Sequence, residues 1–178
     1  ALVTAREALP LDEDMPPLRT ALAEAGVAAD VPYWDDPTLD WSGYDAALLR
    51  STWDYVDRLH EFLAWCERCA RQTRLLNSPG VVRWNTDKHY LVHLAQAGVP
   101  VVPSRFVEPG ADAEAEFAAF LAGGPGSCNV GRAPAFDEFV VKPAIGAGSR
   151  DAARYAHDEA GAALLHVERL IGAGRSVM

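Results

Sequence analysis

Two lysines occupy positions where an amine needs an anionic partner. Lys142 ends an apolar run at residues 139–141 that predicts a strand, so its ammonium group should be partly buried. Lys88 falls in the first turn of a helix expected at residues 85–97, and such a helix end favours an anion. Because a buried, unpaired ammonium is costly, Lys142 needs an anion. A cation in the first turn of a helix opposes the helix dipole, so Lys88 is best explained if it helps to hold a phosphate group. An exposed Lys142 and a solvated Lys88 paired with Asp87 remain the alternative.

A small, glycine-rich turn follows the second of these lysines. It consists of Gly146, Ala147, Gly148, Ser149 and Arg150. Glycine lets backbone N–H groups approach a phosphate closely, and turns of this kind form anion-binding nests. The spacing is neither that of a Walker A loop nor that of a dinucleotide fingerprint, which would need glycine at position 151. A plain hairpin turn remains the alternative.

A third candidate site follows an apolar run at residues 46–49. It comprises Arg50, Ser51, Thr52, Trp53, Asp54 and Tyr55. Ligands of open α/β sheets bind beyond the carboxyl ends of parallel strands, which is where this segment should lie. Arginine can grip a carboxylate with two nitrogens, hydroxyl groups adapt to a ligand, and aromatic rings enclose it. The same residues would also suit a capped helix entry with the aromatic rings in the core.

Other reactive patterns are weaker. Cys66 and Cys69 form a C-x-x-C inside an expected helix, and no second cysteine pair completes a zinc site, so buried structural cysteines are the favoured interpretation. His89 and His93 are spaced for a metal on one helix face, yet no third ligand is evident. A Ser-His-Asp mechanism lacks a nucleophile elbow.

Apolar periodicity predicts alternating strands and helices that would position these residues. Strands are expected at 2–4, 27–34, 45–51, 75–76, 100–107, 138–143 and 153–155. Helices are expected at 12–25, 57–72, 85–97, 112–121 and 158–171. A turn is expected at 77–80 and a surface loop at 123–134. This order predicts an α/β protein with a doubly wound parallel sheet at residues 1–80 and an α+β unit at 81–178.

The composition is that of an ordinary globular protein. The 178 residues are 49% hydrophobic and 23% charged, with a formal net charge of −9. Such acidity disfavours nucleic acid and anionic membranes as main partners. No apolar run is long enough to span a membrane, no signal peptide is visible, and three cysteines do not make a disulfide framework, so a cytoplasmic protein is expected. Both ends resemble interrupted strands, which suggests a fragment.

In combination, these features resemble the ATP-grasp superfamily, and within it the glutathione-synthetase-like members. The resemblance rests on residues 49–55, 76–79, 84–88, 140–143 and 146–150, and it extends over nearly the whole chain. It implies a pre-ATP-grasp domain followed by an incomplete central ATP-grasp subdomain, with the C-terminal lobe beyond Met178.

The resemblance also implies a function. ATP would lie between two lobes, with Lys88 and Lys142 on its α- and β-phosphates and the glycine-rich turn over them. Residues 50–55 and Asn77 would line the substrate end. Such enzymes activate a carboxylate or similar oxygen by phosphoryl transfer, and the most similar members close O-ureido-D-serine to D-cycloserine.

Several parts of the ATP-grasp site are not expected in these residues. The Mg²⁺ ligands and the adenine clamp would follow Met178, so no metal ligand and no catalytic side chain is assigned here. The segment alone should show no turnover and at most weak ATP affinity. A homodimer is common among such enzymes.

Two other classes of protein remain open. One is a non-catalytic α/β module that binds a nucleotide or metabolite. The other is a nicotinamide-dependent Rossmann enzyme, which is weaker because the glycine-rich turn follows a late strand and no ribose-binding acidic residue suits it.

Overall fold

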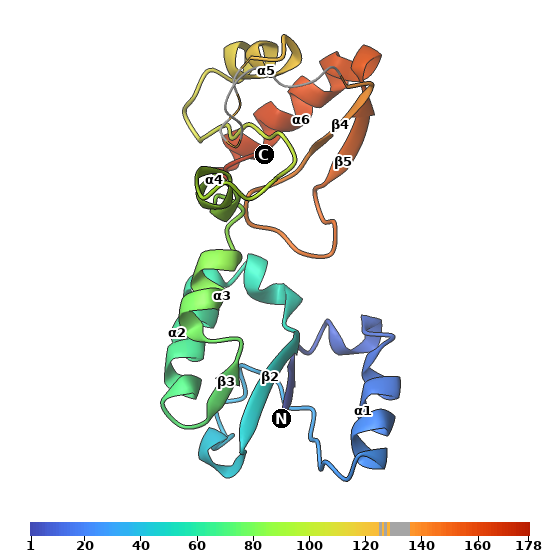
Figure 1. Cartoon of the computed structure of the whole chain (residues 1–178), viewed down its shortest axis with the longest axis vertical. Helices are drawn as coiled ribbons and strands as arrows, with labels where there is room; N and C mark the ends of the chain where they lie inside the picture. The colour runs from blue at the N-terminus through green and yellow to red at the C-terminus, as the bar shows by residue number, and fades with distance from the viewer. Residues whose placement is uncertain (125, 127, 129–135) are drawn as a thin grey trace. The chain divides into compact units, whose positions relative to one another are not determined.

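The computed structural model of the chain describes residues 1–124, 126, 128 and 136–178 (Figure 1). Its contacts group into two compact units, Ala1–Trp84 and Asn85–Met178, and each has its own hydrophobic core. Both units combine helices with strands, so the predicted mixed α/β class is confirmed. Among the described residues, no helix has the length and apolarity needed to cross a membrane.

A parallel three-stranded sheet forms the centre of the first unit, as predicted. Its strands are β1 (Leu2–Thr4), β2 (Ala46–Ser51) and β3 (Arg74–Leu76), in the order β1-β2-β3. Leu48 pairs with Leu2 on one side and with Leu76 on the other. Figure 1 shows α1 on one side of the sheet and α2 and α3 on the other. The carboxyl ends of the three strands therefore meet at one edge.

The strand expected at residues 27–34 is wrong as a regular strand. The chain does run beside β1, where the N–H groups of Leu2 and Thr4 donate to the carbonyl oxygens of Asp30 and Pro32 at 2.8 and 3.0 Å. Only Tyr33 forms a bridge, with Thr4. Pro32 has no N–H group to donate, which prevents a continuous ladder at this edge.

Helices predicted at 12–25 and 57–72 are confirmed as α1 (Met15–Glu24) and α2 (Leu59–Ala70). Prolines occupy the first turn of α1, where a missing N–H costs nothing, and Gly26 ends it at a φ of +74°. Short 3₁₀ turns η1 (Leu9–Leu11), η2 (Trp41–Gly43) and η3 (Trp53–Val56) connect these elements. The sequence missed α3 (Pro79–Asn85), because the Asn-Ser-Pro-Gly run that begins it is also typical of a turn.

The core of the first unit is aromatic and is built on α2. Phe62, Trp65, Cys66 and Cys69 lie on its buried face at helical spacing. The ring centroid of Trp34 lies 5.4 Å from that of Phe62 and 6.0 Å from that of Trp65, both in edge-to-face geometry. Such pairs contribute about 0.5–1.5 kcal/mol beyond the area they bury.

An antiparallel hairpin and two helices form most of the second unit. The hairpin joins β4 (Glu138–Val141) to β5 (Ala153–Ala156), with Val141 opposite Ala153. The turn η4 (His157–Glu159) leads into α6 (Ala160–Gly172), which packs on both strands and on α5 (Ala113–Leu121). The predicted hairpin and both of these helices are confirmed.

Two predictions for the second unit are wrong. The helix expected at 85–97 begins only at Tyr90, as α4 (Tyr90–Gln96), because residues 86–89 form a turn. The strand expected at 100–107 is extended chain with a single bridge between Val107 and Val177. The loop expected at 123–134 lies largely outside the described residues.

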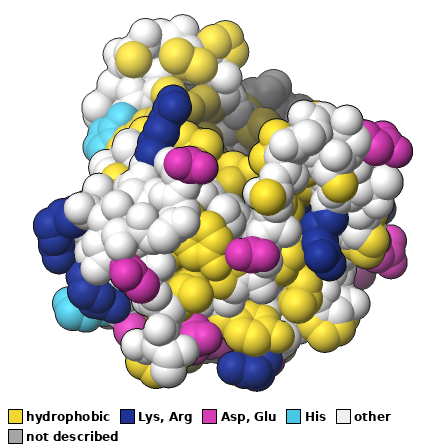
Figure 2. Space-filling model, turned by 90° about the horizontal axis from the view of Figure 1, so that it is seen from below, with side chains coloured by type: hydrophobic (Ala, Val, Ile, Leu, Met, Phe, Trp, Pro, Cys, Tyr) yellow, Lys and Arg dark blue, Asp and Glu magenta, His cyan; other side chains and the backbone are white. Residues whose placement is uncertain are grey.

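The surface carries both signs of charge. On the face in Figure 2, acidic, basic and apolar side chains are interspersed. The formal net charge of the whole sequence is −9.

The C-x-x-C thiols should be inert in the native chain. Both cysteines are fully buried, and burial raises the pKa of Cys66 to about 12 and of Cys69 to about 11. Because the thiolate is the reactive form, we expect neither thiol to react with Ellman's reagent at pH 8 until the protein unfolds. A rapid native reaction of two thiols would contradict this and restore a redox role for the pair.

Candidate functional site

Lys88 lies in the turn that precedes α4, and its amine contacts the glycine-rich turn. Its Nζ donates hydrogen bonds to the carbonyl oxygens of Ala144 and Gly146 at 3.1 and 3.2 Å, and its backbone N–H donates to Ala144 at 3.0 Å. The expected place in the first turn of a helix is wrong, because α4 starts at Tyr90. The candidate anion site at Lys88 therefore rests on the contacts of its amine with the loop after β4, and not on the dipole of a helix.

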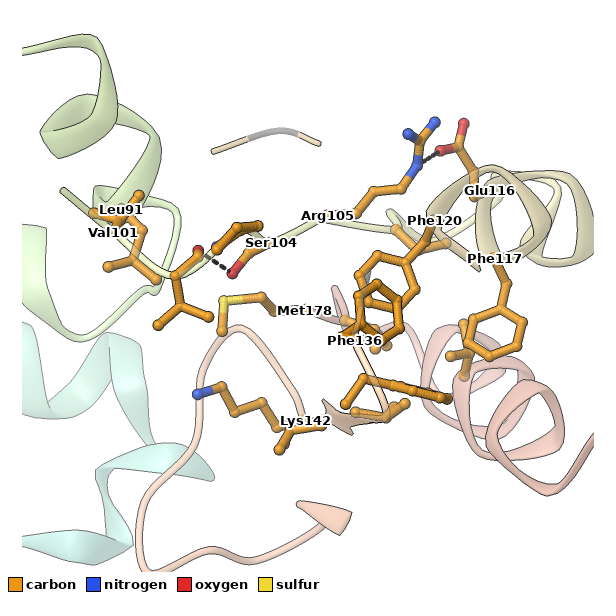
Figure 3. A pocket seen from close by; sticks show the side chains of 18 of the residues that line it. Leu91, Val101, Ser104, Arg105, Glu116, Phe117, Phe120, Phe136, Lys142 and Met178 are labelled. Carbon is orange, nitrogen blue, oxygen red and sulfur yellow. Dashed lines mark hydrogen bonds and ion pairs between the residues drawn. The ribbon is translucent and has the colours of Figure 1, made fainter. Parts of the chain in front are cut away.

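Lys142 follows β4 and is held by the last residue of the chain. Its backbone N–H donates to the Met178 carbonyl at 3.0 Å, and the Met178 N–H donates back at 2.8 Å. Residues paired in this way place their side chains on the same face. The Met178 thioether therefore lies beside the Lys142 stem, as Figure 3 shows.

The Lys88 amine lies near enough to Lys142 for the two charges to interact. Burial lowers the pKa of Lys88, and the nearby positive charges of Lys142 and Arg175 lower it further, against the opposing effect of Asp87. The sequence contains no other lysine. Neither ammonium group forms an ion pair with a described residue. The region therefore has uncompensated positive charge that would attract an anion.

Three residues in and beside the glycine-rich turn have left-handed backbone conformations. Gly148, Ser149 and Asp151 have φ angles of 60°, 56° and 57°, in the left-handed region. For residues other than glycine this conformation costs roughly 1–2 kcal/mol each. Residues 148–150 are exposed, so their backbone is accessible to a ligand.

Gly146 is needed where this turn begins. A Cβ atom there would lie 3.1 Å from Cγ of Pro143 and 3.8 Å from Nζ of Lys88. A side chain at this position would therefore press on the ring of Pro143 and would lie in van der Waals contact with the amine.

Sequence reasoning missed Arg175. Its Nη1 lies 2.6 Å from Oδ2 of Asp151, and its Nη2 donates to the Ile145 carbonyl at 3.4 Å. It therefore contacts both ends of the glycine-rich turn and adds a third cation near Lys88. No spacing signal links a residue after α6 to a loop 24 positions earlier.

A mostly apolar cavity of about 740 Å³ opens beside Lys142 in the second unit (Figure 3). Lys142 extends toward the end where Leu91 and Val101 lie. At the other end the figure shows the aromatic rings, namely Phe117, Phe120 and Phe136. The site therefore combines an apolar cavity with a cation on its wall, as expected for a ligand with an apolar part and an anionic part.

The turn that carries Lys88 is fixed by His89. Its Nδ1 lies 2.6 Å from the Asp87 carboxylate, its Nε2 lies 2.8 Å from that of Glu108, and its ring stacks on Phe106 at 4.0 Å. Burial acts to lower the pKa of His89, but the hydrogen bonds to these two carboxylates outweigh burial and raise it. Glu108 also accepts a hydrogen bond from Ser176, which ties the turn to the segment after Arg175.

The described residues provide no metal site. Nowhere among them do three side chains of the His, Cys, Asp or Glu types gather as ligands. Both ring nitrogens of His89 already face carboxylates, so the spacing of His89 and His93 does not produce the metal site considered as an alternative.

Arg50, in the first unit, is already paired. Its Nη2 lies 2.9 Å from the buried carboxylate of Asp12 and 2.9 Å from that of the exposed Asp14. Nε of Arg50 and Oδ2 of Asp12 are buried without a hydrogen-bond partner. Any substrate carboxylate at Arg50 would therefore have to compete with these two acids.

The other candidates of the first unit divide between core and surface. The Ser51 hydroxyl lies 2.7 Å from that of Thr4, and both residues, like Thr52, are buried. The Asp54 carboxylate accepts a hydrogen bond from Nε1 of Trp34 at 2.9 Å, and Tyr55 stacks on Phe62. Trp53 and Asn77 are exposed.

Known proteins resemble this α/β chain, which carries its cationic site in the second unit. Residues 1–77 match the family model for the N-terminal domain of the D-cycloserine synthetase DcsG. The cycloserine biosynthesis protein DcsG of Streptomyces lavendulae is 45% identical over 178 residues, which is 100% of this chain and 56% of that protein.

A solved structure gives the same result. The crystal structure of D-cycloserine synthetase DcsG matches 99% of this chain and 56% of the solved chain, with 45% sequence identity and a TM-score of 0.80. The chain is therefore a close homologue of this synthetase and spans just over half of its length.

Replacing Asp54 should destabilise the fold. In Asp54→Ala the buried Nε1 of Trp34 loses its acceptor, which should lower the free energy of unfolding by about 1–3 kcal/mol. Asp54→Asn keeps an acceptor oxygen and should cost less. Urea unfolding followed by tryptophan fluorescence measures both. Equal stability of Asp54→Ala and the wild type would show that this hydrogen bond does not stabilise the fold. Ligand binding would then be the remaining role predicted for Asp54.

Lys88 should titrate below the ordinary lysine value of 10.5. With only two lysines, NMR of a sample labelled at the lysine Nζ and Cε resolves each amine directly. The unfolded chain holds this proton more tightly, so its titration should raise folding stability as pH increases from the lowered pKa to 10.5. Removing a neighbouring charge, as in Lys142→Met, should raise the pKa of Lys88. A Lys88 pKa at or above 10.5 in the wild type would contradict the convergence of charges.

Proposed function

We propose that this chain supplies the phosphate-binding part of an ATP-grasp enzyme in cycloserine biosynthesis, which uses ATP to close O-ureido-D-serine to D-cycloserine. The observation that carries the proposal is the meeting of the Lys88 amine, the Lys142 charge and the glycine-rich turn within one unit. Close homology to D-cycloserine synthetase supports the choice of reaction.

The proposed role of the two lysines is to neutralise the α- and β-phosphates of ATP. Lys88 is oriented by two carbonyl oxygens at 3.1 and 3.2 Å, which leaves the third N–H of its ammonium for a phosphate oxygen. Lys142 brings a second charge from the end of β4. The backbone of residues 146–149 would fold over the phosphates, with its N–H groups as donors.

In this proposal the apolar cavity would hold the rest of the nucleotide. Its volume of about 740 Å³ suits a ligand of nucleotide size, and Lys142 lies on its wall. The base would then pack on apolar side chains near Met178, and the phosphates would extend toward Lys142. Excluding water from this cavity would strengthen the attraction between the ammonium groups and the phosphates.

Catalysis of this kind needs positioning and charge neutralisation more than a protein nucleophile. Magnesium, when bound to ATP, supplies further charge neutralisation at the phosphates. The described residues do not form a site for it, so we assign its ligands to none of them.

Arg50 could bind the substrate carboxylate by exchanging one of its partners. Asp14 has a side chain that is 83% exposed, whereas the side chain of Asp12 is 2% exposed. A substrate carboxylate could therefore replace Asp14 at low cost, while Asp12 would keep the guanidinium in place. The exposed residues Trp53 and Asn77 would complete this end.

Two measurements test the proposed function on the full-length protein. Phosphate release from ATP should depend on O-ureido-D-serine. Lys142→Met, which keeps the length of the stem, should weaken ATP binding by about 1–3 kcal/mol, the scale of a charge-assisted contact.

Arg154→Gln is the matched control for this variant. It removes one positive charge from an exposed position on the same hairpin and should leave ATP affinity near that of the wild type. Unchanged affinity in Lys142→Met would remove Lys142 from the site. Nucleotide binding without phosphate release for any ureido or amino acid would favour the non-catalytic binding module.

A further inference from the structure

One side chain bridges the two ends of the loop at residues 145–151. The Arg175 guanidinium contacts the carbonyl oxygen of Ile145 at 3.4 Å and the carboxylate of Asp151 at 2.6 Å. Asp151 also pairs with Arg169, at 3.1 Å. The two ends of the loop are therefore held together by a residue that lies outside the loop.

The backbone of Arg175 is fixed on both sides. Its N–H donates to the Leu170 carbonyl at 3.1 Å, in the cap of α6 that Gly174 forms with a φ of +75°. The next residue, Ser176, accepts a hydrogen bond from the N–H of Ala144 at 2.8 Å. Arg175 thus reaches the loop from a rigid position between a helix end and an extended pairing.

The loop needs such support to keep its shape. Ser149 and Asp151 both have left-handed backbones, which residues other than glycine adopt reluctantly. Within the loop, short backbone hydrogen bonds run from Arg150 to Ala147 and from Ala152 to Ser149, at 3.2 and 3.0 Å. Strained conformations of this kind persist only where the surroundings enforce them.

We infer that Asp151 and Arg175 are positioning residues whose ion pair holds the glycine-rich loop in its phosphate-binding shape. The choice of a polyphosphate ligand rests on the proposed function, but the bracing of the loop does not. By fixing the two ends of the loop, the pair pre-organises the backbone N–H groups before a phosphate arrives, so less ordering is needed on binding.

Direct contact between Arg175 and a phosphate is the competing explanation, and Asp151→Asn separates the two. Asparagine tolerates the left-handed backbone but lacks the charge that holds Arg175. If Arg175 acts only by direct contact, removing a nearby negative charge should strengthen the binding of a polyanion. If the ion pair braces the loop, the same substitution should weaken binding, against the Coulomb trend.

The first arm measures binding of inorganic tripolyphosphate by calorimetry. We expect Asp151→Asn to lose roughly three- to tenfold in affinity, as if the loop held its binding shape for a tenth to a third of the time. Asp151→Gly relieves the backbone strain but removes the brace, and it should also bind more weakly. Arg175→Lys should restore part of the affinity lost in Arg175→Gln. Arg169→Gln, which leaves the bridge to Ile145 intact, should stay within about twofold of the wild type.

The second arm needs no ligand. Amide hydrogen exchange of residues 145–152 should be faster in Asp151→Asn and Asp151→Gly than in the wild type, while α6 keeps its protection. Equal loop exchange in these variants would overturn the brace, and so would tripolyphosphate affinity that is unchanged or stronger in Asp151→Asn. If the wild type binds no tripolyphosphate, the phosphate site fails, and the exchange rates alone decide whether the brace exists.

Discussion

The hydrogen bonds from the Lys88 ammonium to the Ala144 and Gly146 carbonyls are the interaction on which the rest of the site depends. They join the turn before α4 to the loop after β4, across 56 and 58 positions of sequence. They also hold a half-buried charge close to two other cations, an arrangement that is unfavourable for the fold alone. Groups held at such a cost are typical of sites whose ligand relieves it. In the proposed function, a phosphate provides that relief.

The chain uses its two kinds of basic residue differently. Of its 16 basic residues, two are lysines. Arginines hold the structure together through ion pairs, such as Arg50 with Asp12, Arg58 with Asp35 and Arg175 with Asp151. A planar guanidinium suits such fixed, forked contacts, whereas the ammonium of lysine is a compact charge on a flexible stem. Among the described contacts neither lysine forms an ion pair, and both lysines belong to the second unit.

The sequence predicted the elements of this site better than their connections. The β4 strand, the turn and the return strand follow from apolar alternation and glycine, which are local signals. The start of α4 was misplaced because Asp87, which accepts hydrogen bonds from the backbone N–H and the ring of His89, stabilises a turn where a helix was expected. Arg175 could not have been found, because its partners are brought to it by the cap of α6 and the pairing of Ser176, and neither is encoded near the loop. Tertiary contacts, rather than propensity, decide these features.

The segment from Arg50 to Tyr55 shows why composition alone did not separate a binding site from a core. Charged, hydroxyl and aromatic side chains after a strand suit either role, and the choice is made by partners that are distant in sequence. The Asp54 carboxylate is hydrogen-bonded to the buried Trp34, and the Ser51 hydroxyl is hydrogen-bonded to the buried Thr4. Arg50 differs, because one of its two acids is buried and the other is exposed. A ligand can replace an exposed partner without leaving a buried charge unpaired, so within this segment the argument for substrate binding is strongest for the arginine.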